Sequence, residues 1–563
     1  MALKDRLHRF ASKALRLLAS PGYVKQKAEL NYDLAITTRE VGGWAAGGEL
    51  LSEISGRLGI LSLTNLPMHA KFHCLVAKSM QLRGWSPVIF TNRGYGSAHA
   101  YYRLFGLNNL VMWNDVVSQW GESSETLDKI VESLLPRRLS VSTARTITFH
   151  SVHVGEHALS LTCRYRVEGR LNLHEAGTRA MFRSHLKSAV QSVLVANNWL
   201  EQTPLDKLLV RDAGYIPSGP IFEVALQRGV DCAVFEFGQR RSTWVFKRYT
   251  PTTRGQHYFS LSPSTWEEIK KQPWTSERDE VLEQEFAGRY RSDSVDDTRR
   301  LQSGKQILPE NEIYRRIHLD PQKKTAIIFS HIAWDAAFFF GSGLFDDFED
   351  WLFQTVQFVS QTAECRQMNW IVKEHPFNVF KLQRESIKVT SERRLLQPLM
   401  PFPEHICFMP ANTEINTRSL FEIADCVLTV NGTVGMEFPC YGIPALVAGS
   451  GRYSGYGFTI EPPTQDAYFE ALRTLPGIQR LDPIAQELAR KHFYALMVRK
   501  QISFEDVAPM ELKRIHEAQS DVHDNISIRA RSLDDLRASP SLNLLADWLL
   551  DEGLQPDLLG PTT

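Results

Sequence analysis

Long hydrophobic runs are missing from this 563-residue chain. The most suggestive stretch, around Ala336–Phe340, falls far short of the roughly 18–20 consecutive apolar residues that a membrane-spanning helix needs. We therefore do not expect the chain to cross a membrane. Its length exceeds the roughly 250–300 residues at which a single hydrophobic core stops growing, so we expect at least two domains.

Cysteines are few and the net charge is zero. The seven cysteines are scattered and form no C-x-x-C motif, which argues against a disulfide framework and a cysteine zinc site and fits a reducing cytoplasm. Basic and acidic residues number 64 each, so the sequence lacks the overall basic character of a nucleic-acid-binding protein. His69 and His73 lack the glutamate of an H-E-x-x-H motif, which argues against a zinc-protease site.

The charge is nevertheless unevenly distributed along the chain. Residues 1–27 contain seven basic residues and one acidic residue, and apolar residues recur there at three- and four-residue steps up to Leu18. This pattern predicts a basic amphipathic helix that ends near Pro21. Such a helix either lies on an anionic membrane through residues 1–20 or packs on its own domain with a solvated basic face. No continuous apolar segment follows the charges, so it is not a signal peptide.

Short apolar runs alternate with helical patterns through most of the chain, which predicts an α/β protein with parallel sheets. We expect an N-terminal α/β domain at 45–265, a helical connector at 266–318, a second α/β domain at 319–484 and a mainly helical tail at 485–563. The strands of the second domain are expected at 326–329, 370–372, 406–408, 426–430 and 445–447. Two such domains place a ligand cleft at the carboxyl ends of their strands.

The strongest candidate for a binding site is the turn after the strand at 426–430. Asn431, Gly432 and Thr433 lead directly into a helix that begins with Val434 and Gly435. Backbone N–H groups and the positive end of the helix dipole favour a phosphate over such a turn. Thr433 can donate its hydroxyl, and Glu437, one turn into the helix, can accept hydrogen bonds from a ribose. The alternative is a plain turn that Thr433 caps.

Other polar residues also follow predicted strands and are candidates for the same cleft. Ser330 and His331 follow the first strand of the second domain, and Lys373 and His375 follow its second strand. A histidine at such a position can bind a phosphate or protonate a leaving group, although a capping role is an equal alternative.

Two more candidates come from a loop and from the first domain. The glycine-rich segment at 449–457 contributes Arg452, either as a loop that closes over a ligand or as a plain surface loop. Asp212 follows the predicted strand at 207–210 and is our candidate catalytic carboxylate, with structural capping as the alternative.

Several of these segments, in this order and spacing, resemble the capsule polysaccharide biosynthesis family, which includes the β-Kdo transferases of bacterial capsule and O-antigen assembly. The resemblance covers residues 319–460 and rests on FSHIAWDAAFF (329–339), Asp350-Trp351-Leu352, VKEHP (372–376) and TVNGTVGMEFPCYGIPALVAGSGRYSGYGFT (429–459). The chain departs from the family pattern at Gly432, where a serine is expected, and at Phe438-Pro439. These departures leave the identity of the donor open.

The resemblance implies a GT-B fold, in which two Rossmann-like domains face a cleft and the C-terminal domain holds a nucleotide-sugar donor. It implies that His375 and the turn Asn431-Gly432-Thr433 contact the donor phosphate, with CMP-Kdo as the leading donor and a nucleoside-diphosphate sugar as the alternative. The acceptor would be a lipid-linked or oligosaccharide glycan at the inner face of the cytoplasmic membrane. Asp212 would act as a base or as a nucleophile.

No cofactor and no metal are expected in this interpretation. No two aspartates stand two positions apart, so the chain lacks the D-x-D motif of metal-dependent, single-domain glycosyltransferases. Three other functions remain open: a sugar-nucleotide 2-epimerase, a polyol-phosphate transferase with a cytidine-diphosphate donor, and a non-catalytic subunit that binds a glycan or a partner. The epimerases fit less well at the glycine turn, where they carry Gly-Gly followed by paired glutamates.

Overall fold

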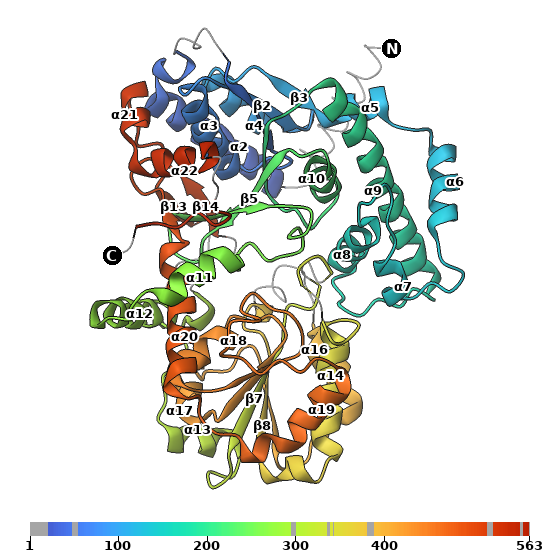
Figure 1. Cartoon of the computed structure of the whole chain (residues 1–563), viewed down its shortest axis with the longest axis vertical. Coiled ribbons are helices and arrows are strands. Elements are labelled where there is room, and N and C mark those ends of the chain that lie inside the picture. Colours follow the sequence, from blue (N-terminus) through green and yellow to red (C-terminus); the bar gives the residue numbers. More distant parts are fainter. Residues whose placement is uncertain are drawn as a thin grey trace. The chain divides into compact units, whose positions relative to one another are not determined.

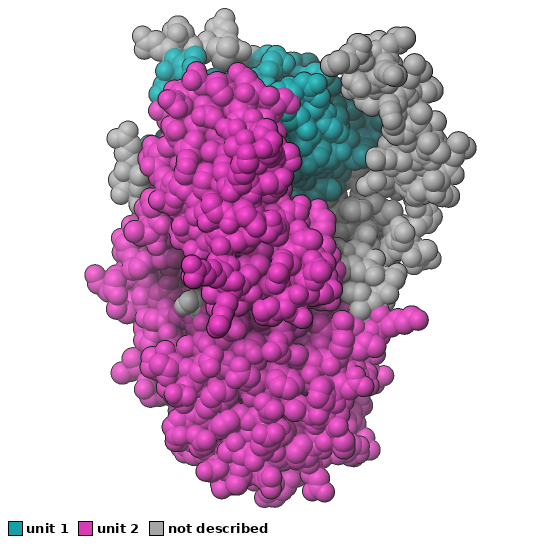
Figure 2. All heavy atoms as spheres, turned by 90° about the vertical axis from the view of Figure 1, so that its right-hand side faces the viewer, with its two compact units in different colours: residues 1–115, 504–511, 524–550 teal, residues 116–503, 512–523, 551–563 magenta. Residues whose placement is uncertain are grey.

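The computed structural model describes residues 21–47, 54–293, 300–334, 338–341, 343–379, 388–514, 522–551 and 555–561. The predicted amphipathic segment at residues 1–20 lies outside the described residues. The chain forms two compact units (Figure 2). The first comprises residues 1–115, 504–511 and 524–550, and the second comprises residues 116–503, 512–523 and 551–563.

The first unit contains three parallel strands joined by helices. Strand β1 (Gly56–Leu61) pairs with β2 (Trp85–Thr91), and β2 pairs with β3 (Leu110–Met112). Helix α3 (Pro67–Gln81) connects the first two strands and α4 (Gly96–Leu104) the next two. Pro67 suits the first turn of α3 because its missing N–H would have no partner in the helix. Helix α2 (Pro21–Val41) and η1 (Trp44–Ala46) precede β1.

The C-terminal part of the chain returns to this first unit. Helices α21 (Leu533–Ala538) and α22 (Pro540–Leu550) pack on α3, and the ring of Phe504 stands edge-on to that of Phe72 at 5.1 Å. Asp33 of α2 is buried between Lys71, whose Nζ lies 2.9 Å from it, and Asn525, whose Nδ2 donates to it at 2.6 Å. The first unit is therefore completed by residues far from it in sequence.

The second unit begins with a helical block. Its helices are α5 (Trp113–Trp120, which starts in the first unit), α6 (Ser124–Leu134), α7 (Val141–Arg145), α8 (Val154–Arg166) and α9 (Ala176–Gln202). Strand β4 (Lys207–Val210), helix α10 (Ser218–Gln227) and strand β5 (Asp231–Phe237) follow as a parallel βαβ unit. Strand β6 (Thr243–Tyr249) is antiparallel to β5 and to the short strand β12 (Ile502–Ser503).

A five-stranded parallel sheet forms the rest of the second unit. Its strands are β7 (Thr325–Phe329), β8 (Asn369–Lys373), β9 (Ile406–Met409), β10 (Cys426–Thr429) and β11 (Ala445–Val447), in the order β11-β10-β7-β8-β9. All residues of β7 and β8 are buried, as expected for strands that are covered on both faces. This order is that of a doubly wound Rossmann-type sheet, and it confirms the predicted α/β class with parallel strands.

Helices cover both faces of this sheet (Figure 1). On one face, α14 (Phe348–Gln361) and α19 (Gln465–Thr474) pack against a core that contains Ile328. On the other face, α13 (Glu310–Ile317), α17 (Leu420–Ile423) and α20 (Pro483–Tyr494) pack against a core that contains Ile327. Successive strand residues therefore point to opposite cores, as the pleat requires. The remaining short helices of this part are α16 (Ser391–Leu396), α18 (Val434–Glu437), η3 (Glu364–Gln367), η4 (Gln397–Leu399), η5 (Thr417–Ser419), η6 (Phe438–Tyr441) and η7 (Leu475–Gly477).

The expected connector and tail are partly as predicted. The connector contains α11 (Pro263–Lys271), α12 (Ser276–Arg289), η2 (Arg300–Gln302) and α13. The tail contains the rest of α20, η8 (Ala495–Arg499), α21 and α22, but also β12, β13 (Met510–Arg514) and β14 (Val522–Ile526). These strands of two to five residues are too short for a period-2 pattern to stand out in the sequence. No helix in the described residues is long and apolar enough to cross a membrane.

Candidate functional site

The five-stranded sheet has its topological switch point between β7 and β10. The chain winds away from β7 toward β8 and β9 on one side, while β10 and β11 lie on the other. The turns that follow β7 and β10 therefore diverge and leave a crevice, which is where such sheets bind their ligands. His331 follows β7 and Asn431 follows β10. Two residues that the sequence analysis proposed as site candidates therefore lie at this switch point.

His331 holds the two turns together. Its Nε2 accepts hydrogen bonds from the N–H groups of Val430 at 3.0 Å and of Asn431 at 3.3 Å, so the ring proton is assigned to Nδ1. Burial, together with the charges of His375 and Arg452, lowers the pKa of His331 to about 3. The imidazole is therefore neutral, and it acts as a support for the turn rather than as a cation for a donor phosphate.

The glycines of the turn are required by close packing. A Cβ on Gly432 would lie 2.7 Å from Oγ1 of Thr429, which accepts the hydrogen bond of the Gly432 N–H at 3.0 Å. A Cβ on Gly435 would overlap the phenol ring of Tyr453. A serine at position 432, as in the family pattern, would thus collide with the Thr429 hydroxyl that accepts the N–H of residue 432.

Helix α18 starts at this turn and is only one turn long. The N–H of Gly435 donates to the carbonyl of Gly432 at 3.1 Å, and that of Glu437 to the carbonyl of Thr433 at 3.0 Å. Within the described residues, no hydrogen bond takes up the N–H of Thr433 or Val434. These two N–H groups are the ones that the turn can offer to an anion.

Arg452 lies against the same turn. Its Nη2 donates to the carbonyl of Asn431 at 3.3 Å, its backbone N–H donates to Oδ1 of Asn431 at 3.3 Å, and its guanidinium lies over the ring of Phe259 at 5.9 Å. Burial lowers the pKa of Arg452, and the positive charge of Arg289 adds to this effect. Across the described chain, Arg452 forms no ion pair with a carboxylate.

Arg289, at the end of α12, contacts the turn from another side, and the sequence analysis missed it. Its Nη2 donates to the hydroxyl of Thr433 at 3.0 Å, and its Nε donates to Oε1 of Glu437 at 2.9 Å. The hydroxyl of Tyr290 donates to the other oxygen of Glu437. The buried carboxylate of Glu437 is thus engaged by Arg289 and Tyr290, and this placement does not favour the ribose contact that the sequence suggested.

Ser330 and Lys373 lie beneath the surface of the crevice. The hydroxyl of Ser330 donates to Oε1 of Glu392 at 3.0 Å and accepts from the N–H of His375 at 2.9 Å. The Nζ of Lys373 donates to the carbonyl of Glu374 at 3.1 Å, and burial lowers the pKa of Lys373 to about 7. These two side chains position their strand ends, while the half-buried His375 lies close to His331.

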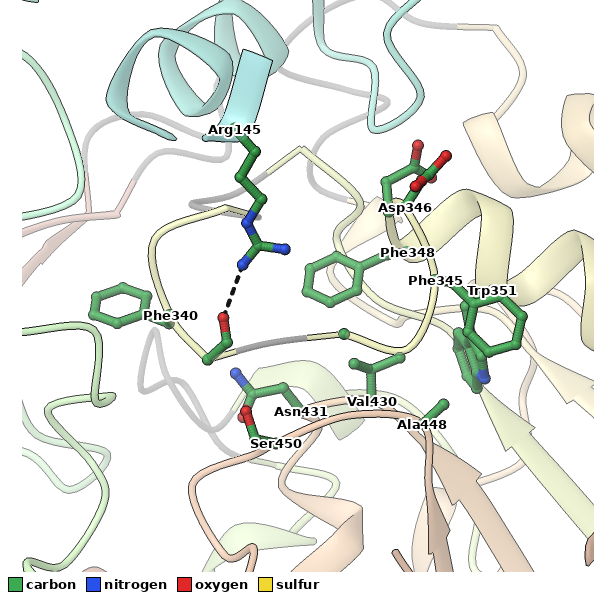
Figure 3. A pocket seen from close by; sticks show the side chains of 13 residues that line it. Arg145, Phe340, Phe345, Asp346, Phe348, Trp351, Val430, Asn431, Ala448 and Ser450 are labelled. Carbon is green, nitrogen blue, oxygen red and sulfur yellow. Dashed lines mark hydrogen bonds between the residues drawn. The ribbon is translucent and has the colours of Figure 1, made fainter. Parts of the chain in front are cut away.

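A small pocket that is open to solvent adjoins the turn (Figure 3). It is lined by Asn431, Val430, Ala448 and Ser450 from one side, by Arg145 of α7, and by Phe340, Gly341, Gly343, Phe345, Asp346, Asp347, Phe348 and Trp351. The Nη2 of Arg145 donates to the carbonyl of Gly341 at 3.0 Å, the bond drawn in Figure 3. Burial raises the pKa of Asp347 to about 7, against the hydrogen bond from the N–H of Asp350. The pocket thus combines aromatic rings, two carboxyl groups and a guanidinium.

Asp212 stands at the carboxyl end of β4 in a strained conformation. Its φ is 57°, which is uncommon for a residue other than glycine, and its side chain is 51% exposed. Nη1 of Arg211 donates to Oδ2 of Asp212 at 3.2 Å. Gly214, two residues on, lies against Phe339, next to the pocket residue Phe340. The loop that carries Asp212 therefore contacts the segment that lines the pocket.

No group of three His, Cys, Asp or Glu side chains in the described part of the chain is arranged to hold a metal ion. The predicted site residues of the five-stranded sheet are thus brought together around one turn, and Asp212 lies on a loop packed against the adjoining segment. Arg289, Arg145 and Asp347 are additions that the tertiary structure supplies.

Comparisons with known proteins give matches among solved structures alone: no family model and no curated protein matches the chain. The β-Kdo 2,4-transferase KpsC of Thermosulfurimonas dismutans is 14% identical with a TM-score of 0.32, and the match covers 59% of this chain and 87% of that one. The β-Kdo 2,7-transferase KpsC of the same organism is 17% identical with a TM-score of 0.30, covering 62% and 89%. The UDP-GlcNAc 2-epimerase of Neisseria meningitidis is 9% identical with a TM-score of 0.25, covering 77% and 97%.

Proposed function

We propose that this protein is a metal-independent glycosyltransferase that takes its sugar from a nucleotide donor. The observation that carries the proposal is Arg452, a partly buried guanidinium at the switch-point turn that has no carboxylate partner in the described chain. A buried charge is costly unless it is paired. An anionic group of a ligand over the turn would supply the missing partner.

The chemistry of sugar transfer fits this arrangement. Cleavage of the bond between the sugar and the donor phosphate builds negative charge on the phosphate. The N–H groups of Thr433 and Val434, with Arg452 beside them, would stabilise that charge as it develops. His375 would donate a proton or a hydrogen bond to the leaving group.

Asp212 would supply the carboxylate for the other half of the reaction. It is half exposed, at a strand end, in a backbone conformation that proteins tend to keep at functional positions. It would act either as the base that removes the proton of the acceptor hydroxyl or as the nucleophile of a two-step transfer. The stereochemistry of the product distinguishes the two roles.

The donor and the acceptor follow from the sequence resemblance. CMP-Kdo is the leading donor, and a lipid-linked or oligosaccharide glycan of capsule or O-antigen assembly is the leading acceptor. We place the protein in the cytoplasm, at the inner face of the membrane, where residues 1–20 would bind anionic lipid. No metal and no cofactor are part of the proposal.

The first experiment measures thermal stability with CMP, CDP, UDP, GDP and CMP-Kdo. A nucleotide that binds the folded protein alone stabilises it by about 2.7 kcal/mol at a hundredfold excess over Kd. We expect this stabilisation with a cytidine nucleotide, and we expect Arg452→Gln to lose it. Arg473→Gln is the matched control, because Arg473 also lies over an aromatic ring, Phe358 at 5.0 Å, but on the helix α19.

The second experiment measures transfer from the stabilising donor to a glycan acceptor. Asp212→Asn should lower kcat by about 10²–10⁴, the usual contribution of a general base, and His375→Ala should abolish transfer in a folded protein. Stabilisation by no nucleotide would refute the donor site. Interconversion of UDP-GlcNAc with its 2-epimer, without transfer, would assign the protein to the epimerases instead.

A further inference from the structure

Two carboxyl groups, those of Asp212 and Glu236, lie near the carboxyl ends of the neighbouring strands β4 and β5 in the second unit. Strands β4 and β5 are parallel, with Val210 opposite Val234. Strand β4 ends at Val210, and Asp212 lies two residues beyond it in the turn that follows, whereas Glu236 is still within β5. Both carboxyl groups therefore lie near the carboxyl ends of their strands, and Arg211 contacts both of them.

One guanidinium connects the two carboxyl groups. Arg211 donates through Nη1 to Asp212 at 3.2 Å and through Nη2 to Glu236 at 3.2 Å, while its Nε lies 3.1 Å from the second oxygen of Glu236. The guanidinium also lies over the ring of Phe237 at 5.2 Å. Glu236 thus accepts a hydrogen bond from Arg211 through Oε2, its Oε1 lies within ion-pair distance of Nε, and Asp212 receives the hydrogen bond of Nη1.

The surroundings of the two carboxyl groups differ sharply. Asp212 is half exposed, whereas Glu236 is buried and accepts one further hydrogen bond, from the N–H of Phe237 at 3.3 Å. The apolar Val245 of β6 lies opposite Glu236, and the phenol of Tyr258 interacts with Arg211 from the segment after β6. Burial raises the pKa of Glu236 to about 7, against the charge of Arg211 and together with that of Asp212.

We propose that Glu236 is a positioning residue for Asp212: it holds the Arg211 guanidinium in place and competes with Asp212 for its positive charge. The inference rests on the proposed function, in which Asp212 is the catalytic carboxylate. When Glu236 is ionised, Arg211 is largely neutralised, and Asp212 is left a stronger base or nucleophile. When Glu236 is protonated, Arg211 stabilises the carboxylate of Asp212, which makes Asp212 a weaker base and a weaker nucleophile.

This competition predicts a pH dependence with a definite sign. Because Glu236 loses its proton near pH 7, kcat should rise as the pH increases from 6 to 8. The variant Glu236→Gln keeps the shape of the side chain but cannot ionise. Asp212 should therefore remain a weak base or nucleophile in this variant. We expect kcat of this variant to be about tenfold lower at pH 8, with KM unchanged and with no rise between pH 6 and 8.

A second measurement does not depend on transfer activity. In protein labelled with ¹⁵N-arginine, the Nε–H resonance of Arg211 should move between pH 6 and 8, and it should stay fixed in Glu236→Gln. A rise of kcat that persists in the variant would overturn the positioning role while leaving the transferase function intact. If no donor supports transfer, the proposed function fails, and a pH-independent Arg211 resonance in the wild-type protein would overturn the inference on its own.

Asp231→Asn is the matched control. Asp231 lies at the amino end of β5 and accepts from Lys207 at 2.7 Å and from Arg248 at 2.6 Å. It therefore belongs to an equivalent ion-pair cluster at the opposite end of the same two strands. We expect this variant to lose stability but to keep the pH profile of kcat, whereas a change of that profile would show that any charge loss in the β4–β5 pair has the same effect.

Discussion

Arg289 and Thr433 are joined by a hydrogen bond of 3.0 Å although 144 residues separate them in sequence. The same guanidinium neutralises the buried Glu437. This pair fixes the end of the connector helix α12 to Thr433, the last residue of the switch-point turn and the N-cap of α18. The turn is therefore held from three sides, by Arg289, by His331 and by Arg452.

Arg289→Gln should destabilise the second unit. Loss of the guanidinium leaves the carboxylate of Glu437 buried with the hydroxyl of Tyr290 as its partner, and breaking a buried ion pair in this way costs about 3–5 kcal/mol. Urea unfolding measures the loss. The double variant Arg289→Gln/Glu437→Gln should recover part of the stability, and failure to recover any of it would show that Arg289 acts through other contacts.

Gly435→Ala should disturb the glycine-rich loop. The added methyl group would overlap Tyr453, and such overpacking typically costs about 1–3 kcal/mol. Because Tyr453 neighbours Arg452, nucleotide stabilisation in the thermal-shift experiment should fall as well. Gly477→Ala, where a Cβ meets no atom within 4 Å, is the matched control and should change neither quantity.

The second unit should lose stability in acid, partly because His331 binds a proton more readily in the unfolded chain than in the folded one. Its pKa is about 3 in the folded chain against an ordinary value of 6.5, so between these values the unfolded state binds more protons than the folded state. Stability therefore rises with pH through this window and is lost as the pH falls, by about 1.4 kcal/mol for each pKa unit.

Urea unfolding between pH 4 and 7 tests this dependence. His331→Gln should show a shallower slope than the wild-type protein, although the buried His492, with its pKa also lowered to about 3, still contributes. The exposed His174 supplies the control variant His174→Gln. An unchanged slope in His331→Gln would contradict the buried, neutral state of this histidine.

Deletion of residues 1–20 should reduce sedimentation of the protein with vesicles that contain anionic lipid. A polybasic segment contributes about 1 kcal/mol per basic residue near such a surface. A variant with glutamine at Lys4, Arg9, Lys13 and Arg16 keeps the length of the segment and should lose most of the binding. Equal sedimentation of all three proteins would exclude the membrane role.

Much of the fold could be predicted from the local sequence. Strands β7, β8, β10 and β11 are short apolar runs between turn residues, so the local sequence predicts that both of their faces are buried. The polar residues that follow them were expected at one edge because parallel strands end at the same edge. Asn431, His331 and Arg452 do lie together there.

The roles of individual side chains could not be predicted in this way. A sequence indicates that His331 and Glu437 stand near the turn, but it does not indicate that one accepts backbone N–H groups and that the other neutralises an arginine from α12. Those assignments depend on burial and on partners from distant segments. Helices α5 to α9 and the strands of the tail also escaped prediction, since their packing surfaces lie on other parts of the chain.

The sequence by itself determined the α/β alternation, the parallel strands and the chemical types at the strand ends, because these follow from local periodicity and turn chemistry. Only the tertiary structure decided which charges are paired and which are not. Arg289 forms an ion pair with Glu437, and Arg211 forms ion pairs with Asp212 and Glu236. Arg452 forms no ion pair with a carboxylate of the described residues. Charge pairing depends on distances of a few ångströms between segments far apart in sequence, and folding alone sets those distances.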